Sequence, residues 1–149
     1  MERTFVMIKP DGVKRRLIGD TVSRLEQVGL RIIAMRMLHL TKEMAEQHYA
    51  IHKGKPFYAG LIKFISSGPV VAMIVEGREA VKRVRKLVGV TKPMEAEAGT
   101  IRGDFGMDIG RNIIHAADSP ENAKIEYSIY FTESDIVKNE LPDEIWIYE

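Results

Sequence analysis

The segment Thr4-Phe5-Val6-Met7-Ile8-Lys9-Pro10-Asp11-Gly12 decides how the fold begins. Residues 4–8 form a continuous β-prone run, which is typical of a buried central strand. The proline and the Asp-Gly pair that follow predict a turn at residues 9–12. The chain therefore starts with a central strand that ends at a turn, with Lys9 at the junction.

The rest of the chain alternates between helical and strand patterns. Apolar residues recur at helical spacing in several segments, and short β-prone runs separate these segments. Ser119 followed by Pro120 is a typical helix start, because the serine can cap the helix and proline is favoured at its first position. Predicted helices cover residues 18–28, 41–52, 57–67, 78–88 and 119–131, and predicted strands also cover 31–40, 70–75 and 112–115.

This order of elements predicts an α+β fold. We expect a ferredoxin-like β-α-β-β-α-β sandwich with a four-stranded antiparallel sheet that helices cover on one face. A doubly wound parallel sheet is the alternative, and the absence of both G-x-G-x-x-G and G-x-x-x-x-G-K-[ST] weakens it. The chain shows no repeat or linker, so residues 1–149 are expected to form a single domain.

Composition limits the classes of function. A chain of 149 residues that is 45% hydrophobic can form one globular core. It has no cysteine, which excludes disulfides, thiolate zinc sites and cysteine nucleophiles. The longest strictly apolar run, residues 70–75, is too short to cross a membrane, and we expect a cytoplasmic protein. A formal net charge of +1 argues against nucleic acid as a partner and favours small anionic ligands bound by local cations.

Residues 89–112 form a long segment that is rich in glycine and has little periodicity. Connections of this length are usually functional or disordered, and interspersed charged residues favour an ordered ligand-binding loop here. Cationic and neutral donors lie on or beside it, and Lys9 ends the first strand. Guanidinium, ammonium, hydroxyl and amide groups are what a polyphosphate and a ribose require, which makes these residues binding candidates: Lys9, Arg85, Thr91, Arg102 and Asn112.

The segment Arg111-Asn112-Ile113-Ile114-His115-Ala116-Ala117-Asp118 carries the strongest chemical signal. It places His115 directly after a short apolar run and between small residues. A histidine with open space beside it is a good nucleophile or general base at neutral pH. A buried histidine held by backbone hydrogen bonds is the alternative interpretation of this residue alone.

Three motifs together resemble those of the nucleoside diphosphate kinase family. They are Ile8-Lys9-Pro10-Asp11-Gly12-Val13, Gly99-Thr100-Ile101-Arg102-Gly103-Asp104-Phe105 and Asn112-Ile113-Ile114-His115. The similarity extends from Arg3 to the Trp-Ile-Tyr-Glu end, in the order that the family has. Three separate motifs over nearly the whole chain are far more specific than any one of them.

The resemblance implies that a nucleoside triphosphate phosphorylates His115 and that a nucleoside diphosphate then removes the phosphate, in a ping-pong cycle. By the same resemblance Glu126 orients the imidazole, Tyr49 lies near it, and His52 approaches phosphate. Lys9 and Asn112 match residues that contact the sugar and nearby phosphate. Phosphate-binding positions of the family match Arg85, Thr91 and Arg102 here. The position on which the base stacks matches Phe57, with Leu61 one helical turn further on.

The family also implies partners and assembly. Magnesium is expected on the nucleotide phosphates, with no metal ligand from the chain itself. The resemblance implies a tetramer or hexamer, and residues 92–94 with the aromatic tail at 146–149 favour the hexamer. That tail is expected to pack on the body of the protein or on a neighbour.

Two features leave alternatives open. The family usually has serine at the position of Ala117, so a hydroxyl that bonds Glu126 is missing here. This gap, with the basic helix face at residues 82–86, motivates a second hypothesis: a nucleotide or nucleic-acid binding regulator with weakened phosphotransfer. His48 and His52 have the spacing of a helical zinc pair, but Tyr49 stands where a metalloprotease has glutamate and no third ligand is evident in the sequence.

Overall fold

The computed structural model describes all 149 residues. At its centre is a four-stranded sheet in the order β2-β3-β1-β4, and every neighbouring pair is antiparallel. The predicted ferredoxin-like α+β fold is confirmed. The strands are β1 (Glu2–Ile8), β2 (Arg31–His39), β3 (Pro69–Gly77) and β4 (Ile114–Ala116).

Eight α-helices connect and cover these strands, and short 3-10 turns punctuate the longer connections. The helices are α1 (Pro10–Lys14), α2 (Ile18–Gln27), α3 (Lys42–His48), α4 (Tyr58–Ile65), α5 (Ala80–Val88), α6 (Ile101–Phe105), α7 (Pro120–Tyr130) and α8 (Glu144–Ile147). The 3-10 turns are Ala50–His52, Pro93–Glu95, Ile109–Arg111 and Glu133–Asp135.

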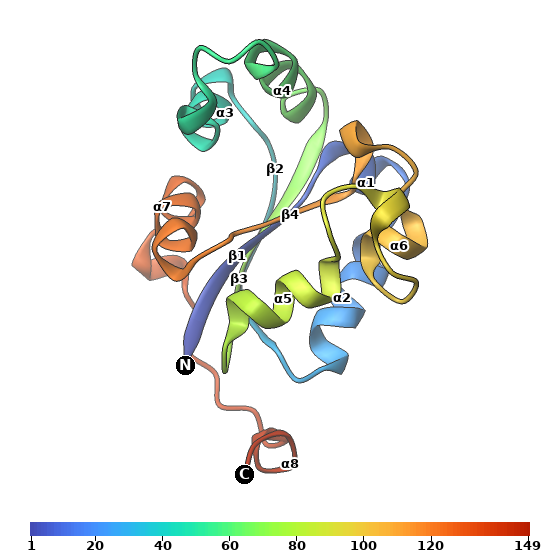
Figure 1. The fold of residues 1–149 in the computed structure, drawn as a ribbon. Coiled ribbons are helices and arrows are strands. Elements are labelled where there is room, and N and C mark those ends of the chain that lie inside the picture. The colour runs from blue at the N-terminus through green and yellow to red at the C-terminus, as the bar shows by residue number, and fades with distance from the viewer.

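Helices cover both faces of the sheet, so the expectation of a single covered face is wrong. Figure 1 shows α3, α4 and α7 on one side of the strands and α2, α5 and α6 on the other. The physical reason is visible in β1. Val6 and Ile8 point into the core beneath α5, while Phe5 and Met7 point into the core beneath α7. Because both sets of alternate side chains are apolar, each face of the central strand needs a cover.

Proline starts a helix rather than a simple turn after β1. Pro10 lies in the first turn of α1, where its missing N–H has no intrahelical partner to lose. The predicted helix at residues 41–52 is also interrupted. Thr41 caps it as expected, accepting a hydrogen bond from the backbone N–H of Met44, but the α-helix ends at His48 and a 3-10 turn follows.

The long segment at residues 89–112 is ordered and contains a helix that its glycine content obscured. Thr100 caps α6 by accepting a hydrogen bond from the backbone N–H of Gly103. The last strand lies later than the predicted residues 112–115, because Ile113 has a φ of 75° and forms a tight turn before β4 begins at Ile114.

The C-terminal tail returns to the end of the sheet where the chain begins (Figure 1). Ile147 packs against Gly29, and the Tyr148 ring lies under the Arg78 guanidinium at 4.6 Å. Trp146 does not pack on the body of this chain: its side chain is 86% exposed. No helix in the structure has the length and apolar character required to span a bilayer.

Candidate active site

Backbone hydrogen bonds fix the position of His115 in β4. This strand pairs with β1, and His115 lies opposite Met7. Just before it, the carbonyl of Ile113 accepts from the backbone N–H of Lys9 at 2.8 Å, and its N–H donates to Oδ2 of Asp11 at 2.9 Å. A positive φ strains an isoleucine by about 1–3 kcal/mol, so these bonds must hold the turn in place. Strain of this kind is typical of functional sites.

Glu126 orients the imidazole of His115. Nε2 of His115 lies 2.8 Å from Oε1 and 3.0 Å from Oε2 of the carboxylate. The two side chains retain limited solvent access, with exposed fractions of 26% and 16%. A carboxylate beside Nε2 favours the tautomer with its proton on that nitrogen. The lone pair of the neutral ring then lies on Nδ1, and a nitrogen lone pair can act as a nucleophile.

His48 packs directly on this pair. Its ring is nearly perpendicular to that of His115, with centroids 4.8 Å apart, and its Nδ1 lies 3.1 Å from the hydroxyl of Tyr130. Burial, with smaller contributions from His115 and His52, lowers the pKa of His48 to about 3. His48 is therefore neutral at physiological pH. His48 groups with His115 and Glu126, whose potential ligand atoms lie within 4.8 Å of one another, rather than with His52.

Lys9 and Asn112 meet beside the strained turn. The ammonium of Lys9 donates to the side-chain oxygen of Asn112, whose amide nitrogen donates to the carbonyl of Thr91 at 3.1 Å. Burial, reinforced by the positive charges of Arg102 and Arg111, lowers the pKa of Lys9 to about 8 despite the nearby Asp11. An anion bound here would restore the favourable environment for the ammonium form.

Arg102 ties the long segment to the turn before β4. Its buried guanidinium donates to three backbone carbonyls, those of Gly89 at 3.1 Å, Asn112 at 3.2 Å and Ile114 at 2.7 Å. Burial and the neighbouring Arg85 lower the pKa of Arg102 to about 10, which leaves it charged at neutral pH. A guanidinium has five N–H donors, and three of those of Arg102 are used in these hydrogen bonds. Two donors therefore remain for a ligand.

Arg85 approaches the same strand from α5. Its Nη1 donates to the carbonyl of Ala116 at 3.1 Å. The backbone carbonyls on either side of His115 thus each accept a hydrogen bond from a guanidinium group: that of Ile114 from Arg102, and that of Ala116 from Arg85. Thr91, by contrast, contributes its backbone carbonyl to the hydrogen-bond network, and its exposed side chain has no partner.

A series of ring contacts leads outward from His115 to Phe57. The ring of Tyr49 lies 4.9 Å from that of His48 and 6.1 Å from that of His52, which in turn lies 5.4 Å from that of Phe57. Phe57 is half exposed, so its ring has a face available for stacking. Leu61 follows on α4, where its backbone N–H donates to the carbonyl of Phe57.

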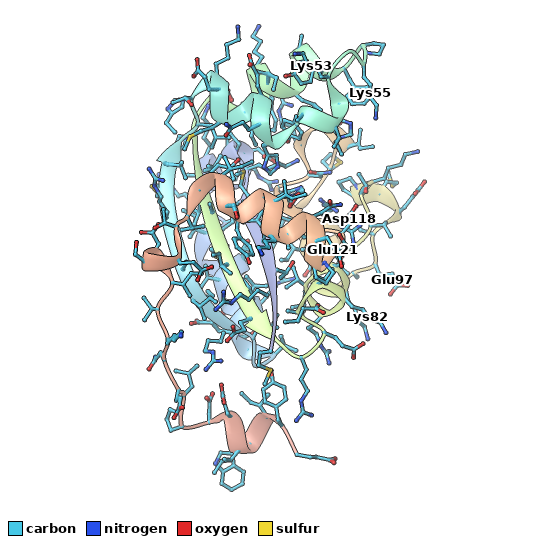
Figure 2. The ribbon with its side chains drawn as sticks, turned by 90° about the vertical axis from the view of Figure 1, so that its left-hand side faces the viewer. Lys53, Lys55, Lys82, Glu97, Asp118 and Glu121 are labelled. Carbon is cyan, nitrogen blue, oxygen red and sulfur yellow. The ribbon has the colours of Figure 1, made fainter.

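The first turn of α7 brings negative charge to one edge of the molecule. Figure 2 shows Asp118 and Glu121 together at the start of this helix, away from Lys53 and Lys55 at the end of the molecule formed by α3 and α4. Ser119 caps α7 by accepting from the backbone N–H of Asn122 at 3.1 Å. Acidic side chains stabilise a helix N-terminus, and a firmly started α7 places Glu126 against His115.

Ala117 is buried and offers no hydroxyl. The side chain that forms a hydrogen bond with Glu126 is therefore that of His115. The hydroxyl that the family resemblance led us to expect here is therefore not replaced by another protein group. The carboxylate keeps some exposure to water, which can fill the missing role.

Sequence reasoning missed four residues of this site. His48 was considered only as a partner of His52, and Tyr130 was not singled out. Arg111 and Phe64 were not singled out, yet the Arg111 guanidinium lies 4.1 Å from the Phe64 ring centroid and the Lys9 ammonium lies 5.8 Å from it. The only sequence signal was that Phe64 recurs with Leu61 and Ile65 at helical spacing in this segment.

The comparisons with known proteins agree with this geometry. A family model described as nucleoside diphosphate kinase matches residues 2–136. A nucleoside diphosphate kinase of Archaeoglobus fulgidus is 60% identical over 149 residues, which are 100% of this chain and 99% of that protein.

Solved structures give the same result. A nucleoside diphosphate kinase family protein from Babesia bovis has a TM-score of 0.96 and 51% identity, covering 99% of this chain and 100% of that one. A halophilic nucleoside diphosphate kinase from Halobacterium salinarum, solved in complex with CDP, has a TM-score of 0.96 and 46% identity, covering 99% of both chains.

An imidazole held by a carboxylate, on a strand that guanidinium groups approach, is the arrangement expected of a phosphotransferase on this fold. The chain belongs to the nucleoside diphosphate kinase family. It is accordingly an enzyme that transfers the terminal phosphate of a nucleoside triphosphate to a nucleoside diphosphate.

Proposed function

We propose that His115 carries the phosphate between two nucleotides in a ping-pong reaction. Nδ1 of His115 attacks the terminal phosphorus, the bond to the bridging oxygen breaks, and the nucleoside diphosphate leaves. The terminal oxygen of a second nucleoside diphosphate then attacks the phosphohistidine, and the P–N bond breaks. The observation that carries this proposal is the hydrogen bond from Nε2 to Glu126, which directs the lone pair to Nδ1.

Each remaining candidate residue has a proposed task. Arg85 and Arg102 stabilise negative charge on the phosphates, with Thr91 as a further donor, and Lys9 with Asn112 holds the sugar and nearby phosphate. Tyr49 and His52 line the path from the imidazole to the base, which stacks on Phe57 beside Leu61. Stacking does not depend on the hydrogen-bonding groups at the edge of the base, so this arrangement supports acceptance of many bases.

Magnesium enters this proposal with the nucleotide. Near His115 the side chains offer ammonium, guanidinium and imidazole groups, and the carboxylate of Glu126 is already paired with the imidazole. This donor set does not fit an ion that prefers an octahedron of oxygens. We therefore assign magnesium to the nucleotide phosphates and no chain ligand to it.

The enzyme is further proposed to act as a hexamer in the cytoplasm. Exposed apolar side chains along the long segment and the tail, such as Met94, Met107 and Trp146, support assembly. Sedimentation of the purified protein and fractionation of its source cells test these two proposals.

Incubation with γ-labelled ATP tests the central step. The wild type is expected to acquire an acid-labile, base-stable label that unlabelled nucleoside diphosphate removes. His115→Ala is expected to acquire none. His39→Ala is the matched control, because His39 lies on β2 and contacts the carbonyl of Ser66 instead of the site. A wild type that binds ATP without becoming labelled contradicts the proposal and favours the regulator hypothesis.

A further inference from the structure

Three potential metal ligands of different chain segments meet beside β4. His48 ends α3, His115 lies in β4, and Glu126 lies on α7. Each offers one ligand atom, and these atoms lie within 4.8 Å of one another. Ligands of a tetrahedral zinc ion, bound at about 2.0–2.1 Å, are separated by roughly 3.3 Å. Side-chain shifts of about 1 Å or slightly more therefore bring the three atoms around one ion.

The chemistry of this set selects the ion. Two imidazoles and one carboxylate suit zinc and similar borderline-soft cations, while magnesium and calcium prefer oxygen alone. Nδ1 of His48 contacts the hydroxyl of Tyr130, and its Nε2 makes no hydrogen bond. In a metal-binding histidine, one ring nitrogen usually forms a hydrogen bond that fixes the ring, and the other nitrogen binds the metal.

We propose that His48, His115 and Glu126 form an inhibitory site for a divalent cation of the zinc type. Coordination through Nε2 of His115 leaves the single proton of the neutral ring on Nδ1. Nδ1 then has no lone pair with which to attack phosphorus. Conversely, a phosphoryl group on Nδ1 keeps the proton on Nε2 and excludes the ion. Metal and phosphate are therefore alternative occupants of one imidazole. This exclusion rests on the proposed phosphorylation of His115, whereas binding of the ion does not.

Calorimetric titration of the nucleotide-free protein with zinc chloride tests binding. One ion per chain is expected, and magnesium chloride should give no comparable heat. His48→Gln and Glu126→Gln should weaken zinc binding by more than the roughly 10- to 100-fold that loss of an outer partner costs. Equal affinity in the wild type and in both variants overturns the site.

Two further variants guard against trivial explanations. His39→Gln is the matched control, because it removes a histidine outside the site, and it should bind zinc as the wild type does. Tyr130→Phe keeps the packing of a buried ring but removes the hydroxyl that holds His48, and it should weaken binding by about 10- to 100-fold. If His48→Gln does not fold, as judged by its unfolding in the presence of EDTA, Glu126→Gln and Tyr130→Phe still decide the question.

Labelling with γ-labelled ATP tests inhibition. Protein loaded with zinc and freed of excess ion should acquire no label from magnesium-ATP. Treatment with EDTA followed by excess magnesium should restore labelling, and protein phosphorylated beforehand should bind no zinc. Normal labelling of zinc-loaded protein overturns the inhibitory role. Absence of label after EDTA treatment and restoration of magnesium contradicts the proposed function, and the titration then still decides the metal site.

Discussion

Lys9 is held in a setting that disfavours its own charge. Burial and two neighbouring guanidinium groups lower its pKa to about 8, so the ammonium is lost as the pH rises through that value. If only the charged form binds phosphate, kcat/KM falls about tenfold between pH 7.5 and pH 9, because this parameter reports the free enzyme. A pH profile of kcat/KM measures the decline.

Lys9→Met provides the comparison for this profile. The variant retains the apolar stem without the charge, so it should have a lower kcat/KM at pH 7 and no decline above pH 8. A wild-type profile that stays flat up to pH 9.5, or an equal decline in the variant, contradicts the assignment of the pKa to Lys9.

Ala117 leaves the Glu126 carboxylate without a protein hydroxyl. One neutral hydrogen bond is worth about 1 kcal/mol, and water can reach the carboxylate. Ala117→Ser should therefore raise kcat by less than about fivefold, as measured by steady-state phosphate transfer. A much larger increase shows that nothing compensates for the missing hydroxyl in the wild type.

The pair at the centre of the site could be predicted from the sequence, while its surroundings could not. His115 was placed by motif and Glu126 by the family resemblance, and the structure brings them to 2.8 Å. His48 and Tyr130 were not assigned, because their contact joins residues that are 82 positions apart. No local pattern encodes such a pairing, which arises only when α3 and α7 pack on the same face of the sheet.

Among the elements, α6 depends on a glycine that has no room for a side chain. A Cβ on Gly103 would lie 1.9 Å from the backbone carbonyl oxygen of Glu97. Because backbone cannot move aside cheaply, Gly103→Ala should displace α6 and its Arg102. We expect a loss of stability above about 2 kcal/mol in denaturant unfolding, together with loss of phosphate transfer.

Gly19 offers a matched control for this substitution. It lies in α2, and a Cβ there meets nothing within 4 Å. Alanine has the higher helix propensity, so Gly19→Ala should leave stability unchanged or raise it by up to about 1 kcal/mol. If both variants lose stability equally, the tight contact at Gly103 is not the cause.

Periodicity predicted the longer elements well, and failed where tertiary contacts decide. The strands β1, β2 and β3 lie where the apolar runs indicated, because each run matches one crossing of the sheet. By contrast, α6 has five residues, too few to show a helical period, and its start depends on the Thr100 cap. The number of covered faces was wrong because α3 and α4 could not be placed from their own sequences.

At the scale of the whole molecule, Trp146 reports on assembly. It is the only tryptophan, and its side chain is 86% exposed in the single chain. A hexamer in which the tail contacts a neighbour should bury this ring and shift its fluorescence emission to shorter wavelength. Sedimentation equilibrium should then give about six times the 16.9 kDa of one chain. Fully solvated emission at every protein concentration, with the mass of one chain, contradicts the hexamer.

A shared sheet also predicts how the molecule unfolds. The two apolar cores lie on opposite faces of the same strands, so neither can persist when β1 is lost. We therefore expect residues 1–149 to behave as a single domain, with coincident loss of helix and of aromatic tertiary signals in denaturant.

Both chain ends lie at the end of the sheet that is remote from the imidazole. Near the N-terminus, Glu2 pairs with Gly77. Near the C-terminus, the hydroxyl of Tyr148 accepts a hydrogen bond from the backbone N–H of Arg78, the residue after Gly77. At the other end of β1, Met7 lies opposite His115. A short flexible peptide could therefore join Glu149 to Met1, with new ends opened at an exposed loop away from the imidazole. The protein is thus suited to circular permutation, and to anchoring on a solid support through either original end with its nucleotide face left open.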